Sequence, residues 1–434
     1  MGESAGIRPR RAALEILSQV REGRTFEAAL NNEVGELTEP DRRLAHELAA
    51  GVLRQRSVLD QRLAPLISRG WAGVPAELQD ILRLGAYQIN ALDRVPAHAA
   101  VDTSVALAKD RAGTKAAGFV NAVLRRLTHS APALVAPSNE PSDRLAAEYS
   151  HPLWLVRRWI DAFGLKQAEA LLRWNNTRPS LVAQPARSDL SELGAAWKEA
   201  GLEFELAPYN AGLILTRSRP AELPGYRSGQ FIIQDPAQAL LARFIAPRPD
   251  AIVYDGCAAP GGKTITLGRE VRAVVAGEVN RLRARRLAEN VGRAGSRREH
   301  VIVADARWPP VRPVDVVLLD APCLGTGTIA RHPDARWRMT PKALSHIAQL
   351  QAELLDVIAL VVAPGGLLVY STCSVEREEN RDQIERFLTR HHQFQRETVA
   401  GFPDALLSEE GDLRILPQLH GMDGAFAARL RRSA

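Results

Sequence analysis

Cysteine is scarce in this sequence, with three residues among 434. They are widely spaced and odd in number, so they do not form a disulfide framework, and they do not match the spacing of zinc ligands. Reduced thiols and no bound metal are therefore expected. Long apolar runs are also missing, and the opening residues, MGESAGIRPRRAALEIL, lack the apolar core of a signal peptide. These absences predict a cytoplasmic protein without membrane association.

Charge and length leave broader possibilities. The formal net charge is +6. Because Lys and Arg neutralise phosphates, this charge suits a polyanionic partner, although a solvated basic surface explains it equally well. A chain of this length with 46% hydrophobic residues can bury at least one large core. Two or three domains are expected.

Three kinds of pattern follow one another along the chain. Apolar residues recur at helical spacing over residues 10–128, and Thr38, Pro40 and Asp41 mark one helix start. Residues 130–142, SAPALVAPSNEPS, suit an exposed connector. The predicted segments are a helical domain at 1–129, a linker at 130–144, a small α+β subdomain at 145–235 and an α/β domain at 236–434.

Short apolar runs alternate with helical patterns from residue 236 onward. This alternation predicts a doubly wound, mostly parallel sheet with helices on both faces. Ligands bind such sheets at the carboxyl ends of strands, so the residue that ends each run is informative. Those residues are Asp255, Glu278, Asp305, Asp320 and Thr372.

A glycine-rich turn, GCAAPGGKT, follows the first run at residues 256–264. It fails the spacing of a phosphate-binding P-loop because Cys257 stands where that motif needs glycine, although Asp320 imitates the magnesium-binding aspartate of ATPases. The dinucleotide motif G-x-G-x-x-G is absent. The remaining interpretation is an adenosine-type cofactor, with its ribose at Glu278 and its adenine at Asp305.

All three cysteines fall in strand-end loops: Cys257, Cys323 and Cys373. A free cysteine is often just a small buried hydrophobe, and Cys257 fits that interpretation as part of a tight turn. The gathering of all three at one edge of one sheet favours a chemical role for Cys323 and Cys373.

Several motifs resemble those of a known family. The main ones are DGCAAPGGKT (255–264), DAPCLGTG (320–327) and YSTCSVEREEN (370–380), with QDPAQ (234–238), RHPDARWR (331–338) and MDGAFAARL (422–430) in support. They resemble the signatures of the NOL/NOP/Sun family of RNA 5-methylcytosine methyltransferases. The helical part, with LRLGAYQINALDRVPAHAAVDTSVALAK (82–109), is similar to NusB, an RNA-binding antitermination factor. The combination is similar to bacterial members that methylate a cytosine in 16S ribosomal RNA.

This resemblance implies S-adenosylmethionine as cofactor, a methyltransferase domain at 236–434 and a NusB-like RNA-binding domain at 1–129. It implies that Cys373 adds to carbon 6 of cytosine, that Cys323 assists product release and that Asp320 bonds the ring near nitrogen 3. The reversed roles stay open, because DNA cytosine-5 methyltransferases use a Pro-Cys nucleophile and Cys323 follows Pro322. The implied cofactor contacts are Cys257, Ala258, Ala259, Pro260, Gly261, Gly262, Lys263, Glu278, Asp305 and Asp320.

The sequence departs from the family pattern at three positions. Glu278 stands where the family usually has Asp, Leu324 replaces the usual Ser, and Ala425 replaces an aromatic residue. None of these changes removes a group that the chemistry requires. Lys263 and the cofactor sulfonium are candidate cations for ionising the Cys373 thiol.

The partner is expected to be RNA, most simply 16S ribosomal RNA bound by a monomer. Transfer RNA and 23S ribosomal RNA are alternative substrates, and a non-catalytic RNA-binding or antitermination factor is an alternative function. Three residues near the Cys323 loop, Arg331, His332 and Trp337, are placed to touch RNA. A basic helix offers either phosphate contacts or a solvated face through Arg281, Arg283, Arg285, Arg286 and Arg293.

Overall fold

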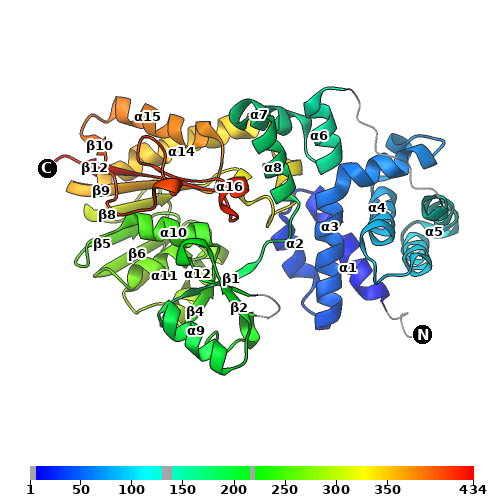
Figure 1. Ribbon diagram of the computed structural model, residues 1–434, viewed down its shortest axis with the longest axis horizontal. Coiled ribbons are helices and arrows are strands. Elements are labelled where there is room, and N and C mark those ends of the chain that lie inside the picture. The colour runs from blue at the N-terminus through cyan, green and yellow to red at the C-terminus, as the bar shows by residue number, and fades with distance from the viewer. Residues whose placement is uncertain (1–5, 130–138, 216–219) are drawn as a thin grey trace. The chain divides into compact units, whose positions relative to one another are not determined.

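The computed structural model describes residues 6–129, 139–215 and 220–434. The chain divides into two compact units (Figure 1). Unit 1 comprises Met1–Thr177 and Ile329–Arg338, and unit 2 comprises Arg178–Thr328 and Met339–Ala434.

Unit 1 is built from helices throughout its described residues, which confirms the predicted all-α domain. Its α-helices are α1 (Ile7–Arg21), α2 (Phe26–Glu33), α3 (Glu39–Leu63), α4 (Ala76–Ala91), α5 (Ala97–His129), α6 (Pro141–Tyr149), α7 (Leu153–Phe163), α8 (Leu165–Asn175) and α13 (Ala335–Arg338).

Glycines allow the long helices of unit 1 to pack closely. A β-carbon on Gly51 of α3 would overlap the ring of Tyr87 on α4, and one on Gly85 of α4 would stand 2.5 Å from a methyl group of Leu124 on α5. The backbones of these helices therefore approach at distances that a larger residue would forbid.

Helix α3 starts directly after Thr38, as the sequence predicts.

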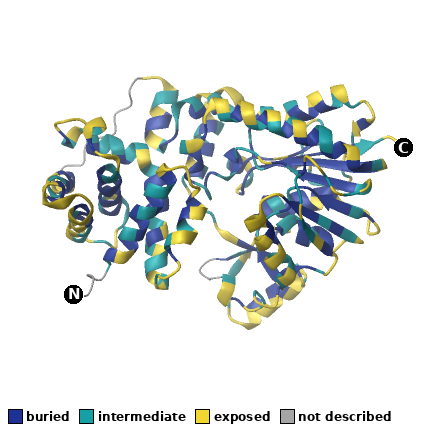
Figure 2. Ribbon diagram, turned by 180° about the vertical axis from the view of Figure 1, so that it is seen from behind, coloured by how far each residue is buried: buried dark blue, intermediate teal, exposed yellow. Residues whose placement is uncertain are grey.

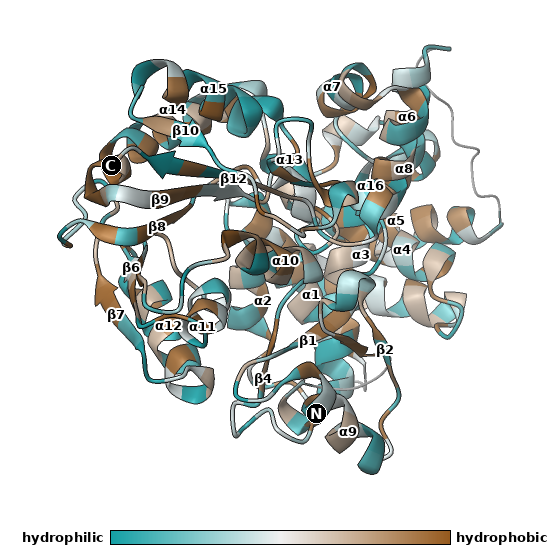
Figure 3. Ribbon diagram, turned by 60° about the vertical axis from the view of Figure 1, so that its left-hand side comes forward, coloured by the Kyte–Doolittle hydropathy of each residue, from teal (hydrophilic) through white to brown (hydrophobic). Residues whose placement is uncertain are grey.

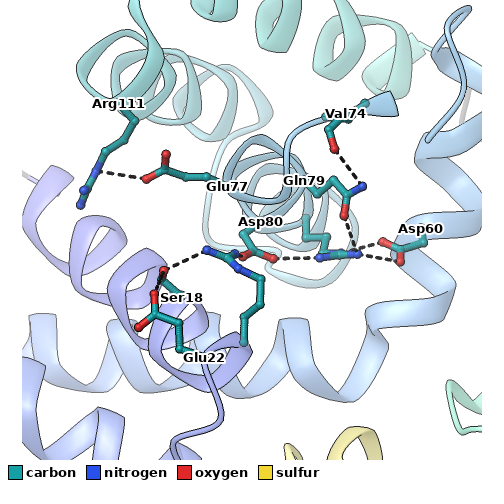
Figure 4. Close-up of polar contacts among 10 residues, drawn as sticks. Ser18, Glu22, Asp60, Val74, Glu77, Gln79, Asp80 and Arg111 are labelled. Atoms are coloured by element: carbon teal, nitrogen blue, oxygen red, sulfur yellow. Dashed lines mark hydrogen bonds and ion pairs between the residues drawn. The ribbon is translucent and has the colours of Figure 1, made fainter. Parts of the chain in front are cut away.

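Buried charges in unit 1 are paired between helices (Figure 4). Arg83 of α4 donates hydrogen bonds to Asp60 of α3 at 2.6 and 2.8 Å and to Asp80 at 2.8 Å. Arg21 of α1 also pairs with Asp80. Removing one partner of a buried ion pair costs roughly 3–5 kcal/mol, because it leaves an uncompensated charge. This network ties α1, α3 and α4 together.

The structure groups helices α6 to α8 with unit 1, whereas the sequence prediction assigns residues 145–177 to the small α+β subdomain. Helix α6 begins inside the predicted linker, and residues 130–138 of that linker lie outside the described residues. The Ser57 amide of α3 donates to the Ser150 hydroxyl at 2.9 Å, just after α6. This contact lies within unit 1, and the predicted boundaries of the small subdomain stay a prediction.

Residues 329–338 also belong to unit 1, although the sequence prediction places them in the α/β domain. Arg336 is fully buried and donates to the Asn175 carbonyl at 2.8 Å and to the Asn176 side-chain oxygen at 2.7 Å. Burial lowers its pKa to about 9. The Trp337 indole donates to the Leu53 carbonyl at 2.7 Å. Hydrogen bonds to the end of α8 and to the middle of α3 therefore anchor this segment in unit 1.

Unit 2 carries all the strands of the described chain. Its strands are β1 (Leu181–Pro185), β2 (Phe204–Leu206), β3 (Leu213–Leu215), β4 (Phe231–Ile233), β5 (Ile252–Asp255), β6 (Ala273–Glu278), β7 (Glu299–Val303), β8 (Val314–Asp320), β9 (Val362–Thr372), β10 (Phe394–Arg396), β11 (Leu413–Ile415) and β12 (Ala425–Arg432). Its α-helices are α9 (Leu190–Glu199), α10 (Pro236–Ile245), α11 (Gly262–Gly268), α12 (Arg281–Ala294), α14 (Pro341–Ile358), α15 (Arg381–Arg390) and α16 (Pro417–His420).

The small sheet of unit 2 is antiparallel in the order β2-β3-β1-β4. Helix α9 covers it through Trp197, which is fully buried and packs edge-on against Phe204 and Phe231. Asp189 caps the start of α9 with a capping box. This is the predicted small α+β subdomain.

The large sheet has eight strands in the order β10-β12-β9-β8-β5-β6-β7, with β11 beside β12. Strands β9, β8, β5, β6 and β7 are parallel, and β12 runs antiparallel to β9. These strands are mostly buried (Figure 2), and hydrophobic colour runs along β8 in Figure 3. The predicted mostly parallel α/β sheet is therefore confirmed.

The segment Pro341–Val361, which contains α14, is by length and composition the one described helix that could cross a membrane. The sequence prediction that no such segment exists is wrong on these criteria. One such helix is weak evidence for a membrane protein, because a core helix of a water-soluble domain meets the same criteria. Its residues Leu354, Leu355 and Ile358 are buried in a core cluster with strands β8 and β9.

Candidate active site

The strand order reverses between β5 and β8, and such a switch point opens a crevice at the carboxyl ends of the strands. Asp255 ends β5 and is buried, and its carboxylate accepts a hydrogen bond from the Thr264 hydroxyl at 2.7 Å. Burial raises the pKa of Asp255 to about 7. The Gly256 amide donates to the Leu318 carbonyl of β8 at 3.0 Å, which joins the two strand ends.

Asp320, at the end of β8, receives two hydrogen bonds. Lys263 of α11 donates to one carboxylate oxygen at 2.7 Å, and the Ser371 hydroxyl of β9 donates to the other at 2.9 Å. Lys263 also bonds Gln238 of α10. The sequence offers Lys263 as a cation for the Cys373 thiol, but the structure pairs it with Asp320. Asp320 is thus held in place from both sides.

The glycine-rich turn is held by β6 and α12. A β-carbon on Gly262 would stand 2.6 Å from the Gln234 side chain, and Gly261 adopts a positive φ of 108°. Arg283 donates to the Ala259 carbonyl at 3.1 Å, and Asn290 donates to the Pro260 carbonyl at 2.9 Å. The close packing at Gly262 and the positive φ of Gly261 therefore require glycine at both positions.

The carboxylates at the ends of β6 and β7 differ in exposure. Glu278 is 3% exposed and accepts from the Asn280 amide at 2.9 Å, with Arg283 at 3.4 Å from its other oxygen. Asp305 is paired with Arg307 at 2.6 Å, and this hydrogen bond lowers the pKa of Asp305. Three apolar side chains near these strand ends are exposed, which the sequence does not predict: Val279, Val303 and Trp308.

The thiols of Cys323 and Cys373 lie 3.1 Å apart. Strands β8 and β9 are neighbours and pair Asp320 with Ser371, so the loops that follow them start at the same level. The hydrogen bond with Cys373, followed by burial, raises the pKa of Cys323 well above its ordinary value. The third thiol, Cys257, also stays protonated, because burial raises its pKa to about 12.

Comparison with known proteins agrees with this architecture. The model of the family "16S rRNA methyltransferase RsmB/F" matches residues 242–431, the NusB family model matches residues 7–129, and an RsmF/B-like ferredoxin-like domain model matches residues 151–222. A probable ribosomal RNA small subunit methyltransferase B from Synechocystis is 35% identical, and the match covers 92% of each chain. The Salmonella paratyphi B ribosomal RNA small subunit methyltransferase B is also 35% identical, over 96% of this chain and 97% of its own.

The chain belongs to the RsmB/F family of 16S rRNA methyltransferases. The solved structure of PH0851 has the same fold over the full length of both chains, with a TM-score of 0.83 and 25% identity. The family resemblance seen in the sequence, the NusB-type helical domain and the methyltransferase activity are thereby confirmed.

The basic helix α12 of this RsmB/F methyltransferase is partly engaged in its own fold. Arg293 donates to the Tyr226 and Phe231 carbonyls at 2.8 and 3.1 Å and lies over the Tyr226 ring. Arg283 holds the glycine-rich turn. These two side chains are neither a purely solvated face nor free phosphate ligands.

Residues 331–337 are also engaged in the fold. Trp337 packs against the core of unit 1, and the Arg56 guanidinium lies 5.3 Å from its ring centre. Burial lowers the pKa of His332. The expected RNA contacts of Arg331, His332 and Trp337 stay a prediction, but for Trp337 a structural role explains every contact that the structure gives it.

Glu379 is not among the predicted site residues, although it lies within the motif YSTCSVEREEN. Its carboxylate contacts both cysteine-bearing loops. The stretch contains three glutamates, and nothing in the local sequence shows which of them is buried. Only the folded structure distinguishes Glu379 from the other two.

Proposed function

We propose that this protein methylates carbon 5 of a cytosine in 16S ribosomal RNA, with S-adenosylmethionine as methyl donor and through a covalent adduct with Cys373. The observation that carries this proposal is the contact at 3.1 Å between the Cys373 and Cys323 thiols, beside Asp320 at the switch point of the sheet. Carbon 5 of cytosine is a weak nucleophile, and addition of a thiolate at carbon 6 makes it enamine-like. A reaction with separate addition and elimination steps suits a site with two thiols.

The residues present fit the cofactor. The glycine-rich turn follows β5 at the carboxyl end of the sheet, where such folds bind ligands, and Glu278 at the end of β6 offers a carboxylate for ribose hydroxyls. The exposed Val279 and Val303 offer apolar contacts for adenine. In this proposal Asp305, another of the predicted cofactor contacts, faces the adenine. When bound, S-adenosylmethionine supplies an electrophilic methyl group.

Each side chain has a role in this proposal that its contacts support. The Cys373 thiolate adds to carbon 6 and the displaced electron pair moves into the ring, where nitrogen 3 takes up a proton through a hydrogen bond with the carboxyl group of Asp320, which Lys263 and Ser371 orient. After methylation the carbon 5 proton leaves to solvent water, the carbon 5–carbon 6 double bond reforms, and the bond from carbon 6 to sulphur breaks. The Cys323 thiol then donates a hydrogen bond to the departing Cys373 sulphur.

The test compares Cys373→Ala and Cys323→Ala with RNA and cofactor on denaturing gels. A stable RNA–protein adduct is expected with Cys323→Ala, because release is impaired, and none with Cys373→Ala. An adduct with Cys373→Ala alone would reverse the roles of the two thiols. Bisulfite sequencing of ribosomal and transfer RNA from a deletion strain checks the substrate, and an unchanged 16S profile would reject 16S ribosomal RNA in favour of transfer or 23S RNA.

The remaining expectations belong to the same proposal. The protein acts as a cytoplasmic monomer, and its NusB-type domain contacts the RNA. Calorimetry with S-adenosylmethionine tests the alternative of a non-catalytic RNA-binding factor, which predicts no measurable binding.

A further inference from the structure

One buried side chain links the two loops that carry the thiols. Glu379 has no exposed surface and follows β9 in the chain. One of its carboxylate oxygens accepts a hydrogen bond at 2.9 Å from the amide of Leu324, the residue after Cys323. The other accepts from the hydroxyl of Ser374, the residue after Cys373. A single carboxylate therefore bridges the two thiol loops.

Further groups support this bridge. Gln351 of α14 donates to Glu379 at 3.0 Å and to the Pro322 carbonyl at 2.8 Å, so it also holds the residue before Cys323. The Tyr370 hydroxyl donates to the Glu379 carbonyl at 2.6 Å. The Thr326 and Ser374 hydroxyls lie 3.0 Å apart, which adds a second link between the loops. The carboxylate thus accepts hydrogen bonds from the Leu324 amide, the Ser374 hydroxyl and the Gln351 side chain.

Stability of the sheet alone does not account for this arrangement. A buried carboxylate carries a desolvation cost that its hydrogen bonds must offset, and burial raises the pKa of Glu379. The strands are already joined up to the pair Asp320 and Ser371 by main-chain hydrogen bonds. The strand pairing does not fix the path of the two loops that follow this pair, and these loops carry Cys323 and Cys373. Glu379 contacts both loops after the paired strands have ended.

We propose that Glu379 is a positioning residue that sets the distance between the Cys323 and Cys373 thiols by holding Leu324 and Ser374. This inference rests on the proposed function, in which Cys323 acts on the sulphur that leaves carbon 6. A displacement of about 1 Å in such a pair can reduce the rate roughly 100-fold. Glu379 touches neither substrate nor cofactor in this proposal.

The closing experiment measures the thiol distance without RNA or cofactor. The full-length protein is treated with the thiol oxidant diamide, which is reduced to its hydrazine as two thiols lose two protons and two electrons to form a disulfide. The Cys323–Cys373 cross-link is followed by peptide mass spectrometry in wild type, Glu379→Ala and Glu379→Gln. The matched control is Glu385→Gln, an exposed carboxylate on α15.

We expect cross-linking to be slowed about 10-fold to 100-fold in Glu379→Ala and unchanged in Glu385→Gln. Glu379→Gln should be intermediate, because its amide oxygen can still accept from Leu324 while its amide nitrogen faces a donor. Single-turnover methylation should fall in the same order. If folded Glu379→Ala and Glu379→Gln cross-link at the wild-type rate, the proposal is overturned.

Two safeguards separate the possible failures. If Glu379→Ala does not fold, Ser374→Ala removes the bridge at one loop only, and a wild-type cross-linking rate in Ser374→Ala and Glu379→Gln would reject the positioning role. If the wild-type protein methylates no RNA while cross-linking still depends on Glu379, the proposed function fails and the positioning role stands.

Discussion

Removing the buried charge of Asp255 should stabilise unit 2 above neutral pH. Asp255 is 1% exposed, and burial raises its pKa from 3.8 to about 7. Between these two values the folded protein binds more protons than the unfolded chain, so stability falls as pH rises through this window. About 3 pKa units at 1.36 kcal/mol each give on the order of 4 kcal/mol lost above pH 7.

Asp255→Asn keeps an oxygen that accepts from Thr264 but carries no charge. The variant should match wild type near pH 4 and gain stability progressively up to about pH 8. For a unit of this size, 4 kcal/mol corresponds to a rise in Tm of roughly 10 °C, which is an upper limit. Scanning calorimetry across this pH range measures the difference.

The control for this measurement is Asp250→Asn, an exposed carboxylate just before β5. It should show little difference from wild type at any pH. The reasoning would be refuted if the Tm difference between Asp255→Asn and wild type were the same at pH 5 and pH 8. A buried carboxyl group with a raised pKa destabilises the fold increasingly as pH rises from 3.8 to about 7, so the difference must grow over this range.

Three further substitutions test the site and its supports. Lys263→Met should lower single-turnover methylation on the order of 100-fold, because it leaves Asp320 without its cation; an unchanged rate would contradict the pairing. Gly327→Ala should lower Tm by several degrees and slow methylation, since its β-carbon would meet the Gly424 backbone at 2.6 Å, and a normal melting curve would count against this close approach. Trp337→Phe should lose about 1 kcal/mol of stability in urea unfolding, with RNA affinity in filter binding unchanged; weaker RNA binding at wild-type stability would instead favour the predicted RNA contact.

Much of unit 2 was predictable because buried parallel strands leave a local pattern. A run such as VDVVLLD can be recognised from its apolar residues alone, and the strand-end rule then singles out Asp320. The same rule brings Cys323 and Cys373 to one edge of the sheet, since their strands are neighbours. The contact between the thiols follows from this topology.

What could not be predicted depends on long-range polar contacts. Arg336 is an arginine in a charged stretch, which composition assigns to the surface, yet it is fully buried, and oxygen atoms of unit 1 accept hydrogen bonds from both of its terminal nitrogens. The assignment of residues 329–338 to unit 1 rests on this burial. Lys263 and Glu379 show the same principle, because partners distant in sequence decide what each charge does.

Contact between the two thiols also bears on which of them attacks. Two sulphurs at 3.1 Å cannot both ionise without strong repulsion, so the pair holds a proton after the first ionisation. The raised pKa of Cys323 places that proton on Cys323, where the charge of Glu379 also disfavours a thiolate. The adduct experiment therefore tests whether Cys323 keeps its proton, because a protonated thiol is not the nucleophile.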